Sequence, residues 1–161
     1  MSTTTCLIIM AGCLILSAYF SATETAFSSA NTTRLKTLAE KGNKRAALVC
    51  RLLERYDRLL STILIGNNIV NIATASIGTV LFVKHYGDAG ATISTVVVTV
   101  VVLIFGEISP KSIAKDCAEQ CAMLSAPMLQ ILIWVFTQLN AIFSLWKKLL
   151  AKVFHLKSDN K

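Results

Sequence analysis

The stretch LLSTILIGNNIVNIATASIGTVLFV, residues 59–83, decides the class of fold, because it is apolar and long enough to cross a membrane yet carries three side-chain amides. A transmembrane helix needs about 20 predominantly apolar residues. Asn67 and Asn71 are four residues apart and Asn68 precedes Asn71 by three, so on a helix the amides form one polar stripe. Such a stripe serves either helix association, through hydrogen bonds across an interface, or a polar binding site.

The whole chain has the composition of an integral membrane protein. Of its 161 residues 54% are hydrophobic and 16% are charged, and the mean hydropathy is +0.61. These values are too apolar for an ordinary soluble domain with one core. The five cysteines form no CxxC pair and lie mostly in or beside apolar runs, so they indicate neither a zinc site nor a disulfide framework.

Apolar segments predict an all-α membrane protein with three transmembrane helices and additional amphipathic helices. We expect the spans at about residues 5–30, 59–83 and 90–110, and the third reaches a sufficient length only if it includes the sequence GEISP. A fourth apolar segment, residues 121–146, contains Pro127 and several amide side chains, so it is not a clean span. We expect it to lie in the interface or to re-enter the membrane.

The distribution of basic residues predicts the orientation, because Lys and Arg in short loops mark the cytoplasmic side. Residues 31–58 hold eight of them against three acidic residues, whereas the loop 84–90 holds one Lys and one Asp. We therefore expect the first loop inside, the second loop and the N-terminus outside, and residues 106–120 inside. The basic tail, residues 151–161, is cytoplasmic only if the fourth segment does not cross, so juxtamembrane helices are predicted at 31–58 and 115–150.

The basic loop itself has helical character. Its leucines recur at spacings of three and four residues in two groups, which Gly42 and Asn43 separate. Two short amphipathic helices on the inner leaflet would place Arg and Lys among anionic lipid headgroups. No aromatic platform accompanies the charge, so membrane-surface electrostatics, rather than nucleic-acid binding, accounts for the net charge of +7. No Lys or Arg precedes Arg34, so the first apolar segment lacks the basic region of a cleaved signal peptide and is expected to be retained.

A second polar face lies on the first predicted helix and includes a carboxylate. Its members recur at helical spacing and are Ser17, Ser21, Glu24, Thr25 and Ser28. An ionisable group inside a membrane is a functional-site hypothesis by default. The alternative is that Glu24 sits hydrated near the inner interface, because the polar stretch up to Ala30 is long.

The third predicted helix contains the sequence FGEISPKS. Pro110 has no backbone N–H, so the carbonyl of Gly106 is expected to lose its helical partner and the helix to kink or stop there. Broken backbone at membrane depth is tolerated only against protein or a wet cavity. Transporters use such carbonyls to coordinate cations, and here Glu107 stands beside the expected break.

The three polar elements together offer only hard oxygen ligands: hydroxyls, amide carbonyls, a backbone carbonyl and carboxylates. His85 and His155 both lie outside the predicted core of the bundle, and no Cys or Met belongs to the polar faces. Oxygen ligands of this kind suit Mg²⁺ or Ca²⁺ rather than zinc or copper, and a mostly neutral set can release its cation. The sequence therefore indicates a cation pathway.

Three motifs in this order, SAYFSATETAFSS, LIGNNIVNI and FGEISPKSIA, give the chain a resemblance to a known family. From about Leu7 to Leu150 it resembles the transmembrane domain, also called domain of unknown function 21, of the CorB/CorC and cyclin M magnesium transporters. The resemblance implies a homodimer of three-helix subunits in the bacterial inner membrane, ringed by juxtamembrane helices, that exports Mg²⁺ by exchange with Na⁺ as the coupling ion. It further implies cytoplasmic CBS modules that bind ATP, which the residues after His155 do not resemble.

The resemblance also assigns residues. It implies a dehydrated Mg²⁺ held near the cytoplasmic side by Ser21, Asn67 or Asn71, Gly106 and Glu107. A weaker role, in Na⁺ binding or in the polarity of the pocket, falls to Glu24, Ser28 and Asn68.

Two other classes of function were weighed against transport. In a membrane anchor or dimerisation module the polar stripes would only hold helices together. An intramembrane protease fits poorly, because the spans contain no pair of aspartates and no His near a serine, and we expect no enzymatic activity.

Overall fold

A computed structural model describes residues 2–154, and all regular structure in this range is helical. Within the described range, three helical stretches are long and apolar enough to cross a membrane, namely residues 3–29, 56–116 and 118–139. The predicted all-α class, with three apolar helical stretches of spanning length, is confirmed. These stretches are not the three expected spans, because residues 56–116 contain both the second and the third, and residues 118–139 overlap the segment that was expected not to be a clean span. His155 and most of the expected basic tail fall outside the described residues.

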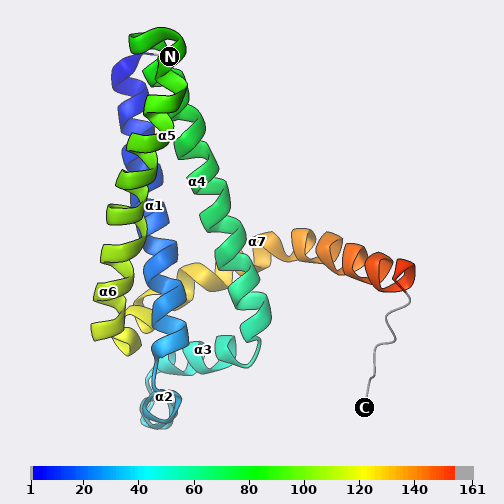
Figure 1. The fold of residues 1–161 in the computed structure, drawn as a ribbon. Helices are drawn as coiled ribbons and strands as arrows, with labels where there is room; N and C mark the ends of the chain where they lie inside the picture. The colour runs from blue at the N-terminus through cyan, green and yellow to red at the C-terminus, as the bar shows by residue number, and fades with distance from the viewer. Residues whose placement is uncertain (1, 155–161) are drawn as a thin grey trace.

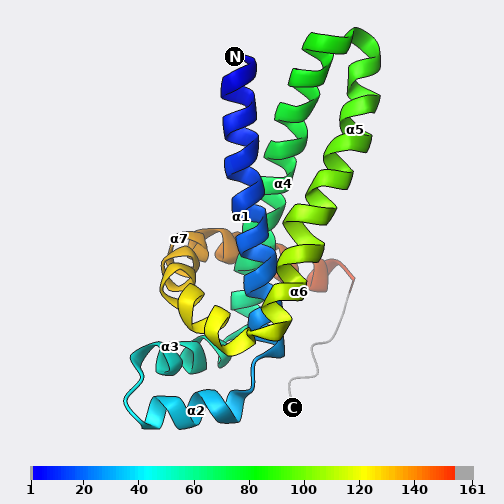
Figure 2. The ribbon, with the colours of Figure 1, turned by 90° about the vertical axis from the view of Figure 1, so that its left-hand side faces the viewer.

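An upright bundle forms the body of the molecule. It consists of α1 (Thr3–Ser29), α4 (Tyr56–Tyr86) and a third rod. That rod is α5 (Gly90–Val101), which continues through the π-helix η2 (Val102–Ile108) into α6 (Ser109–Asp116). Figures 1 and 2 show the three rods side by side, with α4 and α5 antiparallel, and α1 contacts α4, η2 and α6.

A tight turn joins α4 to α5 through the 3₁₀-helix η1 (Gly87–Ala89). Gly87 ends α4 with a φ of 65°, a conformation that L side chains rarely adopt. Gly90 starts α5 so close to the preceding helix that a Cβ there would lie 2.4 Å from the carbonyl oxygen of Phe82. The long apolar stretch 56–116 therefore folds into a hairpin.

Two short helices follow α1, as the leucine spacing predicts. They are α2 (Thr32–Glu40) and α3 (Lys44–Leu53), and Asn31 and Asn43 cap their N-termini by accepting hydrogen bonds from backbone N–H groups. Gly42, with a φ of 96°, makes the break between them. Their apolar faces pack into the core, where Leu35 and Val49 are fully buried.

The last helix, α7 (Ala118–Val153), runs across the bundle and its distal half projects beyond it (Figures 1 and 2). Polar contacts attach its first half to α1: the Tyr19 hydroxyl donates to the Ser125 carbonyl at 3.2 Å, and Thr23 Oγ1 lies 3.3 Å from Ser125 Oγ. α7 covers most of the segment 115–150 that was expected to be juxtamembrane, and that it lies in the interface or re-enters the membrane remains a prediction.

Helix ends differ from the expected spans in one consistent way. α4 extends beyond 59–83 at both ends, and the third rod runs past residue 110 to Asp116. Apolar windows detect the part of a helix that suits hydrocarbon, whereas backbone hydrogen bonding continues through polar residues such as Lys84 and Lys111.

We predict that Gly90→Ala destabilises the fold by about 1–3 kcal/mol, because the new Cβ meets backbone atoms that cannot rotate away. Thermal unfolding of the detergent-solubilised protein measures the loss. Gly12→Ala is the matched control, since nothing lies within 4 Å of a Cβ at Gly12. Equal melting temperatures for the two variants would contradict the close approach at the hairpin.

Candidate functional site

A hydrogen-bonded cluster of side chains joins α1 to α4 inside the bundle. Ser17 Oγ lies 2.8 Å from Asn71 Oδ1 and 3.1 Å from Asn67 Oδ1, and its hydroxyl donates toward both amide oxygens. One hydroxyl hydrogen cannot fully satisfy two acceptors, so the amide oxygens keep unused acceptor capacity. Ser17 is buried, and both asparagines are partly buried.

The third rod approaches this cluster with its backbone at Gly106. Gly106 is buried in η2, and a Cβ built on it would lie 3.0 Å from Ser17 Oγ. Any side chain at this position would crowd the serine hydroxyl, so glycine keeps the backbone of η2 close to the cluster. Segments from all three sequence motifs therefore meet around Ser17.

Ser21, one turn further along α1, is fully buried, and its Oγ has no hydrogen-bond partner among residues 2–154. Three buried threonines avoid this cost by donating to the carbonyl four residues earlier: Thr23, Thr62 and Thr74. A buried hydroxyl without a partner costs about 1–3 kcal/mol, so it calls for an explanation. The Ser21 oxygen is therefore a candidate ligand.

The helix does not stop at Pro110. The N–H of Ser109 bonds to the carbonyl of Ile104, five residues earlier, and the chain returns to α-helix from Ser109 to Asp116. Proline removes one donor and crowds the carbonyl four residues before it. The wider turn of a π-helix accommodates both effects, so the expected kink or stop is replaced by a local change of hydrogen-bond pattern.

The remaining candidate residues divide into two groups. Glu107 and Glu24 are each partly buried, and neither carboxylate has a hydrogen-bond or ion-pair partner within the described chain. Asn68 and Ser28 are exposed, and Ser28 Oγ donates to backbone carbonyls of its own helix, at Glu24 and Thr25. Asn68 and Ser28 thus lie outside the cluster.

Ser17 is the residue whose central position sequence reasoning missed. The sequence placed it on the polar face of the first helix, but only the register between α1 and α4 sets it opposite the asparagines. That register rests on Phe20, whose ring lies 2.6 Å from where a Cβ of Gly66 would be. No pattern within a single helix reports that register.

The cluster consists of neutral oxygen atoms, from a hydroxyl and two amides, and it lies near the middle of α1. Residues 2–154 contain no group of three His, Cys, Asp or Glu side chains that could hold a metal. Ser17 is twelve residues from the end of α1 at Ser29, or about 18 Å along the helix, which is roughly half the thickness of a bilayer core. A cation there would rely on hydroxyl, amide and backbone oxygens, with carboxylates as outer charges.

Comparison with known proteins places these motifs in a wider group. Residues 8–161 match the cyclin M transmembrane N-terminal domain. The chain is 44% identical, over 96% of its length, to a UPF0053 protein of Haemophilus influenzae, and 41% identical, over 89%, to the UPF0053 inner membrane protein YfjD of Escherichia coli. It is 37% identical, over 73%, to a putative DUF21 domain-containing chloroplastic protein of Arabidopsis thaliana.

The chain spans only part of these relatives. It covers 37% of the length of the Haemophilus protein, 34% of YfjD and 18% of the Arabidopsis protein. The relatives therefore contain further sequence beyond the matched domain.

Two serines on one face of α1 give a prediction with opposite signs. In the absence of divalent cations, Ser17→Ala lowers stability by about 1 kcal/mol, because two amide oxygens lose their donor. Ser21→Ala leaves stability unchanged or raises it, because it removes a buried hydroxyl without a partner. Thermal unfolding in detergent with a chelator measures both changes, and a larger loss for Ser21→Ala would contradict the geometry.

Proposed function

Because the chain belongs to the cyclin M transmembrane N-terminal domain family, we propose that it transports Mg²⁺ out of the cell across the bacterial inner membrane, in exchange for Na⁺. The family is not a family of enzymes. The Escherichia coli relative is named an inner membrane protein. The three apolar stretches of spanning length support a membrane location for this chain as well.

One observation carries the proposal: the orphaned hydroxyl of Ser21 lies one helical turn from a cluster in which two amide oxygens share one donor. Serine Oγ, asparagine Oδ1 and the backbone of Gly106 are hard oxygen donors, which Mg²⁺ prefers. Mg²⁺ dehydrates reluctantly, so several such oxygens are needed to replace its waters.

The proposed transport step uses each group differently. Ser21, Asn67 or Asn71, and the Gly106 carbonyl replace water around the ion in the inward-open state. Glu107 has no partner among the described residues, so its charge is available to offset the cost of dehydration. The direct bonds from Ser17 to the asparagines hold the amide oxygens in position. Na⁺ bound from outside would then return the carrier, with Glu24 contributing charge.

Assembly and access are part of the same proposal. We propose a homodimer, with α2, α3 and α7 at the inner leaflet and the N-terminus outside, following the distribution of basic residues. Cytoplasmic CBS modules that bind nucleotide would occupy part of the additional length that the relatives have.

A membrane anchor or dimerisation module is the second candidate, and a specific contact favours it. The bonds from Ser17 to Asn67 and Asn71 already join two helices, which is what association alone requires. Association does not explain why the Ser21 hydroxyl is buried without a partner among the described residues. A binding assay on a Ser21 variant therefore distinguishes a transporter from an anchor.

We predict that Glu107→Gln and Asn71→Ala leave the protein folded but weaken Mg²⁺ binding by about tenfold or more and abolish Mg²⁺ export, because each removes one contribution to the ion's environment. Calorimetric titration of the purified protein with Mg²⁺, with Ca²⁺ and Na⁺ alongside, measures the binding, and Mg²⁺ efflux measures the transport.

The matched control is Asn68→Ala, which removes an exposed amide from the same helix. Normal binding and export in Glu107→Gln or Asn71→Ala would remove that residue from the site. A folded wild-type protein without saturable Mg²⁺ binding would favour the anchor.

A further inference from the structure

A cleft of about 290 Å³ lies where the end of α3, the start of α4 and α7 meet. Arg51 on α3, Arg55 in the break between the helices and Arg58 on α4 all line it, and all three side chains are exposed. Glu54 is the one acidic residue in its lining, which leaves a net charge of three minus one, or two positive charges.

The side chains of the three arginines form no polar contact among residues 2–154. None of their guanidinium groups forms a hydrogen bond or an ion pair with another described residue, although Glu54 and Asp57 are neighbours in sequence. Three guanidinium groups that line one cleft without a partner among the described residues repel one another and favour a bound anion. Guanidinium groups bind phosphate oxygens in a planar, two-point geometry.

Apolar side chains also line the cleft. They are Leu48 and Leu52 on α3 and Ile133 on α7, beside the arginines. A free inorganic anion would gain nothing from these side chains, whereas an amphiphile with an anionic head and a hydrocarbon chain would contact both kinds of residue.

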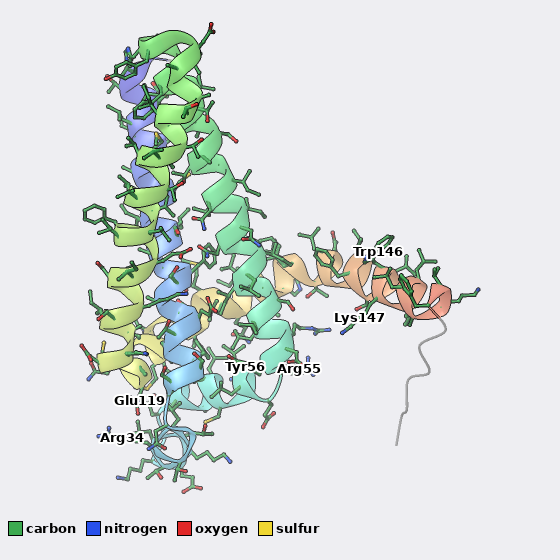
Figure 3. All side chains as sticks on the ribbon, in the orientation of Figure 1. Arg34, Arg55, Tyr56, Glu119, Trp146 and Lys147 are labelled. Atoms are coloured by element: carbon green, nitrogen blue, oxygen red, sulfur yellow. The ribbon has the colours of Figure 1, made fainter. Side chains whose placement is uncertain are left out.

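The position of α7 connects the cleft to a membrane surface. In Figure 3 the projecting half of α7 has Trp146 on its upper side and Lys147 on its lower side. Arg55 lies below α7 in this view, so Lys147 is on the same side of the helix as Arg55. Tryptophan is enriched where hydrocarbon meets headgroups, and lysine extends toward water there. A second pocket of about 310 Å³ shares Arg58 with the cleft and includes Lys147 on α7, with Asp57 as its one acidic residue. Its lining therefore carries two positive charges minus one negative charge, and the net positive charge continues to α7.

We propose that this cleft binds one anionic phospholipid of the inner leaflet, with its phosphate on Arg51, Arg55 and Arg58 and the start of an acyl chain along Leu48, Leu52 and Ile133. The bound lipid bridges α3, α4 and α7. This site is separate from the cluster around Ser17, and its occupancy does not depend on Mg²⁺ transport.

The test compares lipid binding to the purified full chain by native mass spectrometry, with phosphatidylglycerol and phosphatidylcholine added separately. The wild type is expected to retain phosphatidylglycerol preferentially. The triple variant Arg51→Gln/Arg55→Gln/Arg58→Gln is expected to lose that preference, with a decrease of about tenfold or more in apparent affinity. Excess inorganic phosphate is expected not to displace the lipid.

The matched control is Arg34→Gln/Lys36→Gln/Arg45→Gln, which removes the same charge from exposed positions on α2 and α3 outside the cleft lining. It is expected to keep the preference. Equal loss in both triple variants, an unchanged preference in the cleft variant, or displacement by inorganic phosphate would each overturn the proposal. The three single arginine variants give the same readout if the cleft variant fails to fold.

Discussion

Satisfying polar side chains away from water is the constraint on which the rest of this structure depends. The Ser17 hydroxyl, shared between Asn67 and Asn71, fixes how α1 and α4 face each other. In hydrocarbon these groups have no water to bond, so the helices gain from holding them together. The ring of Phe20 against Gly66 sets the same register by packing, and Gly106 then fits the third rod against the serine.

The sequence predicted most of the secondary structure because the relevant signals are local. Capping asparagines at 31 and 43, the glycine at 42 and the leucine spacing determine α2 and α3 within a few residues each. Apolar length determines α1, α4 and the third rod. Helix ends were less predictable, since a helix continues for as long as its backbone hydrogen bonds do.

The site was predicted in part, and the missing part is non-local. Polar periodicity identified the faces that carry Asn67, Asn71 and Ser21, but it cannot say which serine lies opposite which amide, because that depends on the relative height of two helices. The response to Pro110 was also not deducible. The backbone N–H that Pro110 lacks can lead either to a break in the helix or to a π-helical turn. The structure adopts the π-helical turn, which is compatible with the close approach of Gly106 to Ser17.

The same constraint bears on the proposed transport of a cation, which the cluster would have to release as well as bind. A set of several carboxylates would bind Mg²⁺ tightly and would also repel itself when the ion leaves. Neutral hydroxyl, amide and backbone oxygens can remain buried whether or not an ion is present, provided that they can bond one another. Ser17 performs this for the asparagines, whereas Ser21 has no such partner. The polar groups are therefore satisfied at Ser17 and unsatisfied at Ser21. Under the proposed function, this difference would let the cluster both attract an ion and release it.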